Sequence, residues 1–298
     1  MLKYTKIYNM ILLTLIISIF SCNEVSDSSK SCYSNYNSIT LLHDNIEREY
    51  ILYVPASYNE SSITPLMFNF HGFGGSASEY IEYADMRPIS DEENFILVYP
   101  QGSCMEGSSH WNPCPVGGDN KSNADDVGFV EAIINDITNQ YNIDIDRIYA
   151  TGYSNGGMMA YGLANYKSEL FAAVSSVSGS MLDCLETPSH PIAVLHLHGT
   201  SDEVIPYDGN NLYSSVQNTI NHWINFNNTN TNPITEYDET NEVTVEHYKF
   251  NQGDNYVSVE HYKYIGGNHV WFEETFQGRN TAELIWDFVS RYDINGLL

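Results

Sequence analysis

The segment Gly152-Tyr-Ser-Asn-Gly156 constrains the fold of this chain most strongly, because it joins an apolar run to a segment that favours a helix. Residues Arg147 to Ala150 precede it and predict a strand, whereas Met158 to Tyr161 follow it and predict a helix. Glycines on either side of Ser154 allow a sharp turn without Cβ clashes. The pattern itself occurs by chance in many proteins. Its meaning therefore depends on the rest of the chain.

Short apolar segments alternate with amphipathic segments along most of the 298 residues, and no internal repeat divides them. Besides the strand before Ser154, we expect strands at 50–54, 66–70, 95–99, 171–175, 192–197, 243–250 and 257–264. We expect helices at 79–94, 212–226 and 281–292 and along Phe129 to Ile137, and an exposed insertion at 225–241. This alternation predicts an α/β fold with a mostly parallel central sheet and helices on both faces.

The N-terminus resembles an export signal. Two lysines precede the apolar run Met10 to Phe20, which is shorter than the ~20 residues that span a bilayer. We expect a signal peptide at 1–21, a flexible tether at 22–40 and a catalytic domain at 41–298. Ile19-Phe-Ser-Cys22 resembles a bacterial lipobox, which predicts a lipid anchor at Cys22 and an exported, cell-envelope lipoprotein. An ordinary secretory signal with a retained thiol is the alternative.

The cysteine count agrees with export. If Cys22 carries lipid, Cys32, Cys104, Cys114 and Cys184 remain, an even number in an oxidising compartment. Four cysteines allow three pairings. Cys104 and Cys114 bracket a short loop that a bond would stiffen, which leaves Cys32 for Cys184. A metal site is disfavoured, because no two of them form a Cys-x-x-Cys pair.

Charge excludes some partners. The chain has 38 acidic and 12 basic residues, and its formal net charge is −26. Such a surface repels phosphate backbones and anionic lipid, so we expect no nucleic-acid partner. The chain is 42% hydrophobic and 13% aromatic, which supplies ample material for a core.

Candidate partners for Ser154 lie further along the chain. A serine nucleophile needs a base and an acid that orients the base. His269 follows Gly266-Gly267 in a loop after an expected strand, and Asp202 follows the expected strand 192–197. Asp208 is a second candidate acid. The order serine, aspartate, histidine is that of the α/β-hydrolase fold.

A glycine-rich loop supplies the fourth part of such a site. His71-Gly-Phe-Gly-Gly-Ser76 follows the expected strand 66–70, where these enzymes place backbone amides that stabilise an oxyanion. We assign the amides of Phe73 and Asn155 to this role. His71 is expected to orient the loop and not to act as the base.

Other polar and aromatic residues have simpler interpretations. Trp111, Tyr153 and Trp271 are candidate substrate contacts, although tryptophan is more often part of a core. His196 and His198 alternate along one expected strand and are expected to be structural. A cluster of oxygen-bearing residues could suggest a calcium site: Asp119, Asn123, Asp125 and Asp126. It lacks the glycine and the terminal glutamate of an EF-hand, so we prefer helix capping as its role. No metal or cofactor is expected.

Together these motifs resemble those of the polyhydroxybutyrate depolymerase and feruloyl esterase group of α/β-hydrolases. The resemblance covers about residues 45–290 and rests on six segments: His71 to Gly75, Val98 to Gly102, Asp125 to Phe129, Gly152 to Met159, His198 to Tyr207 and Gly266 to His269. It implies an exported serine esterase that acts on a polyester or on acyl groups of polysaccharides. Tyr153 and the lack of an appended binding module favour a feruloyl or acetyl esterase over a depolymerase.

Two other classes of function remain open from the sequence. A lipoprotein could keep the fold and bind glycan without turnover, and a serine peptidase could use the same acyl chemistry. The intact set Ser154, Asp202 and His269 favours the esterase. Since a free histidine has a pKa near ~6.5, activity is expected to decline in acid.

Overall fold

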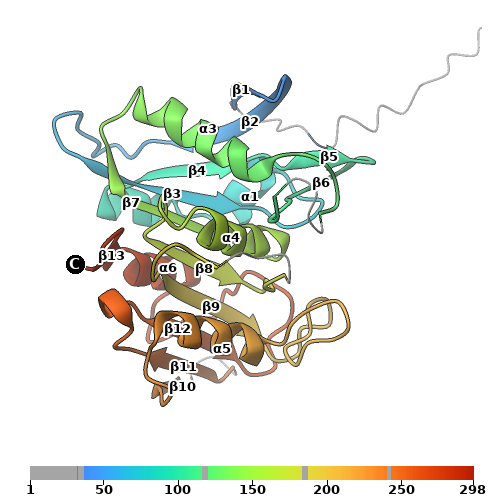
Figure 1. The fold of residues 1–298 in the computed structure, drawn as a ribbon, viewed down its shortest axis with the longest axis vertical. Coiled ribbons are helices and arrows are strands. Elements are labelled where there is room, and N and C mark those ends of the chain that lie inside the picture. Colours follow the sequence, from blue (N-terminus) through green and yellow to red (C-terminus); the bar gives the residue numbers. More distant parts are fainter. Residues whose placement is uncertain (1–31, 33–36, 116–119, 183–186, 240–242) are drawn as a thin grey trace, which may run out of the picture.

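The computed structural model describes residues 32, 37–115, 120–182, 187–239 and 243–298 (Figure 1). Within these ranges ten strands form one sheet, in the order β1-β2-β4-β3-β7-β8-β9-β12-β11-β10. The strands are β1 (Ile39–His43), β2 (Ile46–Tyr53), β3 (Thr64–Phe70), β4 (Ile96–Pro100), β7 (Ile143–Gly152), β8 (Ala173–Val177), β9 (Ala193–Gly199), β10 (Ile234–Asp238), β11 (Val245–Phe250) and β12 (Val259–Tyr264). Strands β4, β3, β7, β8, β9 and β12 run parallel, and antiparallel strands flank them at both edges.

Helices cover both faces of this sheet, as the alternation of apolar segments predicts. One core cluster includes side chains of α1 (Ala77–Tyr83), α2 (Arg87–Glu93) and α6 (Thr281–Val289). The other includes those of α3 (Asp126–Thr138), α4 (Asn155–Tyr166) and α5 (Val216–Asn227), which lie along one face in Figure 1. The central strands β3, β4, β8 and β9 are buried along their whole length, as expected for parallel strands that are covered by helices on both faces. No helix among the described residues is long and apolar enough to cross a bilayer.

The expected helix 79–94 is two helices. The helix α1 ends at Tyr83, and α2 begins at Arg87 with Pro88 in its first turn. A proline there lacks the amide that would continue the preceding helix, so the chain turns at residues 84–86. The side chain of Arg87 fixes the turn by donating to both carboxylate oxygens of Asp85.

The edges of the sheet also differ from the prediction. Strand β10 lies within 225–241, which was expected to be an insertion, and it pairs with β11. The alternation along β10 is weak because only Asp238 is buried. At the other edge, β1 begins at Ile39, before the expected domain boundary at residue 41.

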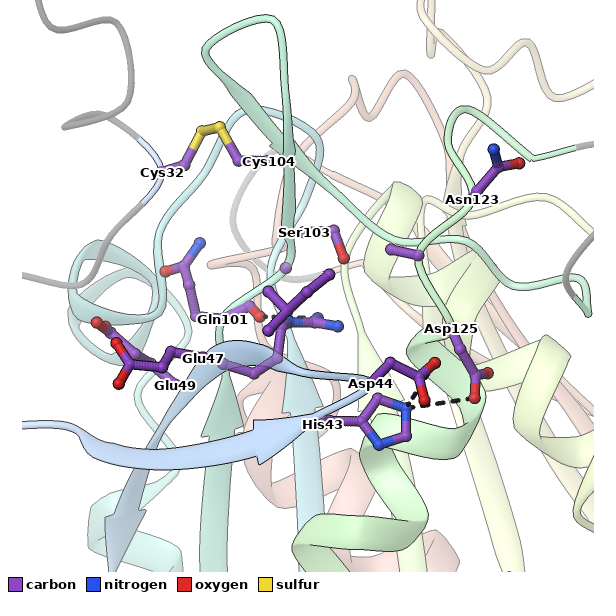
Figure 2. Close-up of a pocket in the computed structure, with 14 residues that line it drawn as sticks. Cys32, His43, Asp44, Glu47, Glu49, Gln101, Ser103, Cys104, Asn123 and Asp125 are labelled. Atoms are coloured by element: carbon purple, nitrogen blue, oxygen red, sulfur yellow. Dashed lines mark hydrogen bonds and ion pairs between the residues drawn. A yellow bond between two sulfur atoms is a disulfide. The ribbon is translucent and has the colours of Figure 1, made fainter.

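The expected cysteine pairing was wrong. Cys32 is bonded to Cys104, and not to Cys184, with Cα atoms 5.5 Å apart (Figure 2). Cys104 lies in β5 (Ser103–Met105), which forms a hairpin with β6 (Ser108–His110), so backbone pairing and not a Cys104–Cys114 bond closes this loop. Cys114 is also disulfide-bonded, whereas Cys184 lies outside the described residues.

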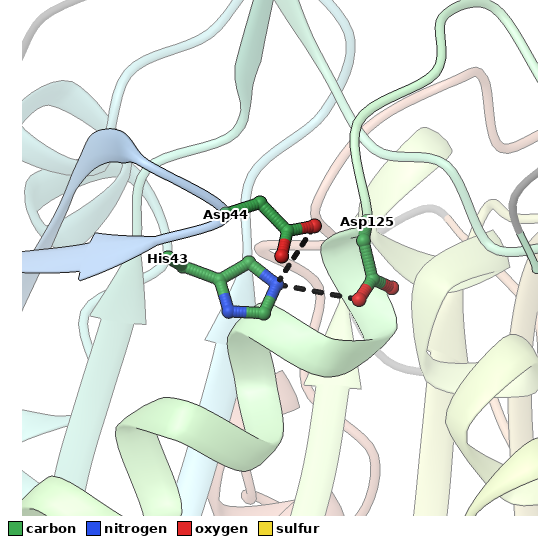
Figure 3. Close-up of side chains that lie close together, drawn as sticks. All are labelled: His43, Asp44 and Asp125. Carbon is green, nitrogen blue, oxygen red and sulfur yellow. Dashed lines mark hydrogen bonds and ion pairs between the residues drawn. The ribbon is translucent and has the colours of Figure 1, made fainter.

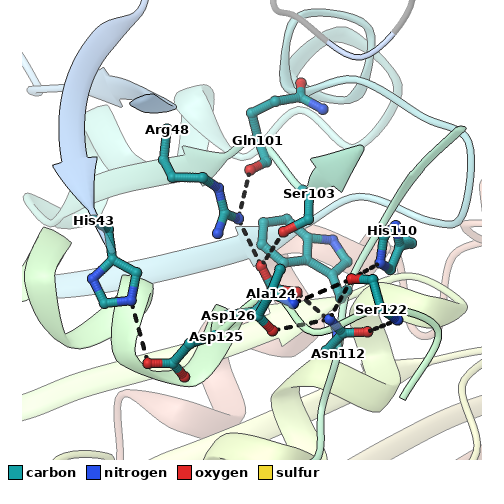
Figure 4. A network of polar contacts seen from close by, with 12 residues as sticks. His43, Arg48, Gln101, Ser103, His110, Asn112, Ser122, Ala124, Asp125 and Asp126 are labelled. Atoms are coloured by element: carbon teal, nitrogen blue, oxygen red, sulfur yellow. Dashed lines mark hydrogen bonds and ion pairs between the residues drawn. The ribbon is translucent and has the colours of Figure 1, made fainter. Parts of the chain in front are cut away.

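A buried ion pair fixes the segment that follows this hairpin (Figure 4). Asp126 is almost fully buried at the start of α3, and Arg48 of β2 donates to its Oδ1 at 2.6 Å. Ser103 donates to the same oxygen at 2.8 Å, and the amide of Asn112 donates to Oδ2 at 2.8 Å. Because every bond converges on one carboxylate, the hairpin and the segment around Asn112 are held against the sheet.

The Cys32–Cys104 bond gives a prediction about stability. It joins residues 72 positions apart. Closing a loop of that length stabilises a fold by about 2–4 kcal/mol, chiefly by restricting the unfolded chain. We expect Cys32→Ser with Cys104→Ser to lower the free energy of unfolding by that amount in urea titrations. The single variant Cys32→Ser is the control and should lose as much, because the same bond is absent. Peptide mapping that finds Cys104 bonded to Cys114 would contradict the assignment.

Candidate active site

The turn at Ser154 is as tight as the flanking glycines predict. Ser154 has φ 55° and ψ −118°, a strained backbone for a residue with a side chain. A Cβ at Gly156 would lie 2.0 Å from the carbonyl oxygen of Phe70, and one at Gly152 would lie 2.4 Å from backbone atoms of Gly156. Only glycine fits at these two positions. The turn places Ser154 directly before α4, which begins at Asn155.

The structure brings Ser154, His269 and Asp202 into one line of hydrogen bonds. His269 Nε2 lies 2.9 Å from Ser154 Oγ, and His269 Nδ1 lies 2.7 Å from Asp202 Oδ2. Ser154 and His269 are partly exposed, whereas Asp202 is buried. The carboxylate next to His269 is therefore that of Asp202 and not that of Asp208.

The Asp202 carboxylate is held from several sides. It follows β9, and its Oδ1 accepts the backbone amides of Val204 and Ile205, both at 2.8 Å. His198 Nε2 lies 3.2 Å from its Oδ2. Burial acts to raise the pKa of Asp202, but the hydrogen bonds from His198, His269 and Ile205 outweigh it and hold the pKa well below its ordinary value. Asp202 is thus a fixed negative charge beside His269.

The loop that carries His269 is tied down by side chains near the turn. The Tyr153 hydroxyl donates to the carbonyl oxygen of His269 at 2.8 Å, and Ser178 Oγ donates to that of Val270 at 3.0 Å. The amide of Trp271 donates to the hydroxyl of Tyr83 at 2.9 Å. Tyr153, expected as a substrate contact, therefore also anchors the histidine loop.

His71 holds the glycine-rich loop from within. Its Nδ1 donates to the Gly72 carbonyl at 2.7 Å, and its Nε2 accepts the Gly102 amide at 2.9 Å. These partners require a neutral ring, and burial lowers the pKa of His71 to about 4. A Cβ on Gly72 would lie 3.5 Å from the Cβ of Ser154, which shows how closely the loop approaches the serine.

The amides expected to stabilise an oxyanion belong to this loop and to the start of α4. Asn155 is the first residue of α4, so its amide has no acceptor within the helix. The amide of Phe73 donates to no described residue. The Asn155 side chain exchanges two hydrogen bonds with the backbone of Trp111, at 2.7 and 3.1 Å. The start of α4 is thereby locked to the segment after β6.

Two of the expected substrate contacts, Trp111 and Trp271, are buried side chains that pack against neighbouring parts of the site. Trp111 is fully buried, and its Nε1 donates to the His71 carbonyl at 2.9 Å. Trp271 is only 7% exposed and packs edge-on against Tyr80. Both side chains support the site from within, and Trp111 also lines a cavity beside Asn155. Substrate binding by Trp111 and Trp271 stays a prediction.

Two small cavities border the neighbours of Ser154 in the chain. The first has a volume of about 170 Å³ and an aromatic lining that includes Phe73, Tyr80, Tyr83 and Tyr153. The second has a volume of about 270 Å³, and its lining includes Asn155, Met158, Leu182, Leu212 and Tyr213. Sequence reasoning missed Tyr80 and Tyr83, because their spacing on α1 does not reveal that this helix faces the glycine-rich loop.

A larger cavity of about 320 Å³ lies elsewhere, between the β1–β2 turn and the start of α3 (Figure 2). His43, Asp44 and Asp125 meet at this cavity, with possible metal-ligand atoms within 4.8 Å of one another (Figure 3). His43 Nε2 lies 3.3 Å from Asp125 and 3.9 Å from Asp44. Asp125 also caps α3 through the Gly128 amide, which confirms helix capping for this residue. We therefore interpret the cluster as a helix cap at Asp125 that also lies within hydrogen-bonding distance of His43.

Comparisons with known proteins show which proteins this chain resembles. The phospholipase/carboxylesterase family model matches residues 117–243. A protein of Aspergillus flavus named "Probable feruloyl esterase C" is 31% identical over 214 residues, which cover 70% of this chain and 73% of that protein. Feruloyl esterase C of Emericella nidulans is 33% identical over 167 residues, or 54% and 57% of the two chains.

A solved structure shows the same fold. The acetyl xylan esterase of Aspergillus awamori matches 85% of this chain and 98% of its own with a TM-score of 0.62, at 15% identity. The chain therefore has the α/β-hydrolase fold, belongs to the family of the feruloyl esterase C proteins, and is a carboxylic ester hydrolase.

Proposed function

We propose that the chain hydrolyses carboxylic esters by a covalent mechanism with Ser154 as nucleophile, His269 as base and Asp202 as the acid that orients it. The hydrogen-bonded line from Ser154 Oγ through His269 to Asp202, at 2.9 and 2.7 Å, carries this proposal. Each bond has the length needed for proton transfer or for fixing a tautomer. The strained turn at Ser154 keeps the hydroxyl exposed for attack.

The reaction proceeds in two acyl transfers. Ser154 Oγ attacks the ester carbonyl while His269 Nε2 takes its proton, and Asp202 stabilises the resulting imidazolium. The amides of Phe73 and Asn155 stabilise the oxyanion of the tetrahedral intermediate. His269 then gives its proton to the leaving alcohol. A water molecule, deprotonated by the same histidine, attacks the acyl-enzyme and releases the acid.

The nucleophile is tested by Ser154→Ala. Without the hydroxyl no acyl-enzyme forms, so the rate of p-nitrophenyl acetate hydrolysis should fall at least about 10³-fold. A fluorophosphonate should label the wild-type chain at Ser154 and leave the variant unlabelled. Hydrolysis that persists in the purified variant would overturn the proposal. A wild-type chain that the fluorophosphonate does not label would instead indicate a glycan-binding protein without turnover.

His71 gives a prediction about pH. Its pKa is lowered from 6.5 to about 4, so below pH 6.5 the unfolded chain binds a proton that the folded chain does not bind. The free energy of unfolding should therefore fall by about 3 kcal/mol between pH 6.5 and pH 4 through this residue. Urea titrations of the wild type and of His71→Gln at several pH values measure the contribution of His71, because glutamine binds no proton in this pH range. Parallel pH curves for the two proteins would contradict the prediction.

The aromatic cavity supports an aryl acyl group as the substrate. The rings of Phe73, Tyr83 and Tyr153 line a space of about 170 Å³ on the side of the glycine-rich loop. A flat aromatic acid fits such a lining through stacking and edge contacts. The names of the relatives, feruloyl esterase C and acetyl xylan esterase, favour acyl groups linked to polysaccharide over a polyester or a peptide.

Phe73→Leu tests the substrate class. It removes an aromatic ring of this cavity and keeps the backbone amide assigned to the oxyanion, so kcat/KM should fall about tenfold for methyl ferulate and little for p-nitrophenyl acetate. Tyr237→Leu is the matched control, because Tyr237 is 60% exposed on the edge strand β10. Equal losses on both esters, or faster turnover of polyhydroxybutyrate than of methyl ferulate, would contradict an aryl acyl site.

We also propose that the mature chain is exported and begins at a lipid-modified Cys22. The Cys32–Cys104 bond supports export, because disulfides persist in oxidising compartments. Mass spectrometry of the mature N-terminus, done on the sample used for disulfide mapping, should find the lipid on Cys22. An unmodified N-terminal thiol there would leave a secreted esterase without an anchor.

A further inference from the structure

A chain of buried side chains continues from Asp202 away from Ser154. His198 Nε2 lies 3.2 Å from Asp202 Oδ2, and His198 Nδ1 lies 3.1 Å from His196 Nε2. His196 Nδ1 in turn lies 2.7 Å from the hydroxyl of Tyr161 on α4. His196, His198 and Tyr161 are each 0% exposed. The mechanism above uses none of the three.

The partners determine where the protons lie along this chain. His198 Nε2 is 2.9 Å from the Ile205 carbonyl, which can only accept, so Nε2 carries the hydrogen. Burial pushes the pKa of His196 well below its ordinary value, so its ring is neutral and accepts at Nδ1 from the Tyr161 hydroxyl. His196 therefore donates from Nε2 to His198 Nδ1. The single Nε2 hydrogen of His198 lies between the Ile205 carbonyl, at 2.9 Å, and Asp202 Oδ2, at 3.2 Å, so the hydrogen bonds run from Tyr161 toward this pair of acceptors.

We propose that His198 is a positioning residue for Asp202, and that His196 and Tyr161 hold His198 in the tautomer that this role needs. The inference rests on the proposed function, since Asp202 matters only if His269 is the base. Asp202 Oδ1 accepts two backbone amides, and Oδ2 lies 2.7 Å from His269 Nδ1 and 3.2 Å from His198 Nε2. Donors that point in one direction polarise one another, which strengthens the bond that reaches the carboxylate.

A second arm of the same cluster leads elsewhere. His261 on β12 donates from Nδ1 to the His196 carbonyl at 2.9 Å and accepts from the Tyr207 hydroxyl at Nε2, also at 2.9 Å. Burial is the main cause that lowers the pKa of His261 to about 3, and Lys263 adds to it. This arm ends on a backbone carbonyl and does not reach Asp202. Tyr207 therefore offers the same chemical group in the same cluster without the proposed role.

Removing the His198 donor should change the pH dependence of the reaction. With one donor fewer, the Asp202 charge is less neutralised and stabilises a positive charge on His269 more strongly. The acid limb of the rate profile should therefore move upward by about half to one pH unit. The maximal rate should fall about 10- to 100-fold, because Oδ2 loses one of the two groups that position it while the amides on Oδ1 remain.

The experiment measures the rate at which a fluorophosphonate modifies Ser154 in the full chain, from pH 5 to pH 9. His198→Leu should show the upward shift and the lower rate. His198→Gln should restore much of both, because its amide nitrogen can donate from the position of Nε2. Tyr161→Phe should shift the limb in the same direction by less. Tyr207→Phe should leave the limb in place, although it too loses a hydrogen bond to a buried histidine and some unfolding free energy.

An unmoved acid limb in His198→Leu, or equal shifts in Tyr161→Phe and Tyr207→Phe, would overturn the inference and leave the cluster a purely structural role. If His198→Leu does not fold, the two tyrosine variants decide, because each removes one hydroxyl. Equal labelling of the wild type and Ser154→Ala would instead overturn the proposed function. The two failures are therefore distinguishable.

Discussion

The contact between the first turn of α4 and the end of β3 is the constraint on which the site depends. The amide of Tyr153 donates to the Phe70 carbonyl at 3.1 Å, and the amide of Ser154 donates to the Val177 carbonyl at 2.8 Å. These bonds bind the turn to the strands on both sides of β7. Gly156 lies against the same Phe70 carbonyl, where a side chain would collide. The position of the serine hydroxyl is thus set by backbone atoms of three strands.

Carboxylates inside this acidic chain are each matched with a cation or a set of donors. Asp126 meets Arg48, and Glu260, 3% exposed, lies between His247 and Arg291. Desolvation of an unpaired carboxylate costs several kcal/mol, so such partners decide which acids can be buried. Asp202 differs because its partners include two backbone amides and the histidine that becomes charged in the proposed reaction. That difference suits the role proposed for Asp202, which is to stabilise a transient charge.

The parts of the site that follow from local pattern could be predicted from the sequence. The glycines on either side of Ser154 predict the tight turn that carries it. Asp202 and His269 each follow a predicted strand, and parallel strands end at one edge of a sheet, so the three side chains are expected to meet there. The pairing of Cys32 could not be predicted, because it depends on where a segment before the first strand passes. The network of His198 was missed for a similar reason: alternation along β9 shows that His196 and His198 are buried but not what they touch. Burial of Trp111 likewise depends on the fold of the segment after β6.

The Cys32–Cys104 bond has a mechanical consequence. Strand β1 forms the outer edge of the sheet and pairs with β2 alone, so a pull on its N-terminal end would open its hydrogen bonds one after another. Tension from residues before Cys32 instead enters the fold at Cys104 in β5 through a covalent bond. Ten positions separate Cys32 from Cys22, the residue proposed to carry the lipid, and ten residues span at most about 35 Å. With the proposed anchor, the bond would limit the distance between enzyme and membrane and would keep tension off the edge strand.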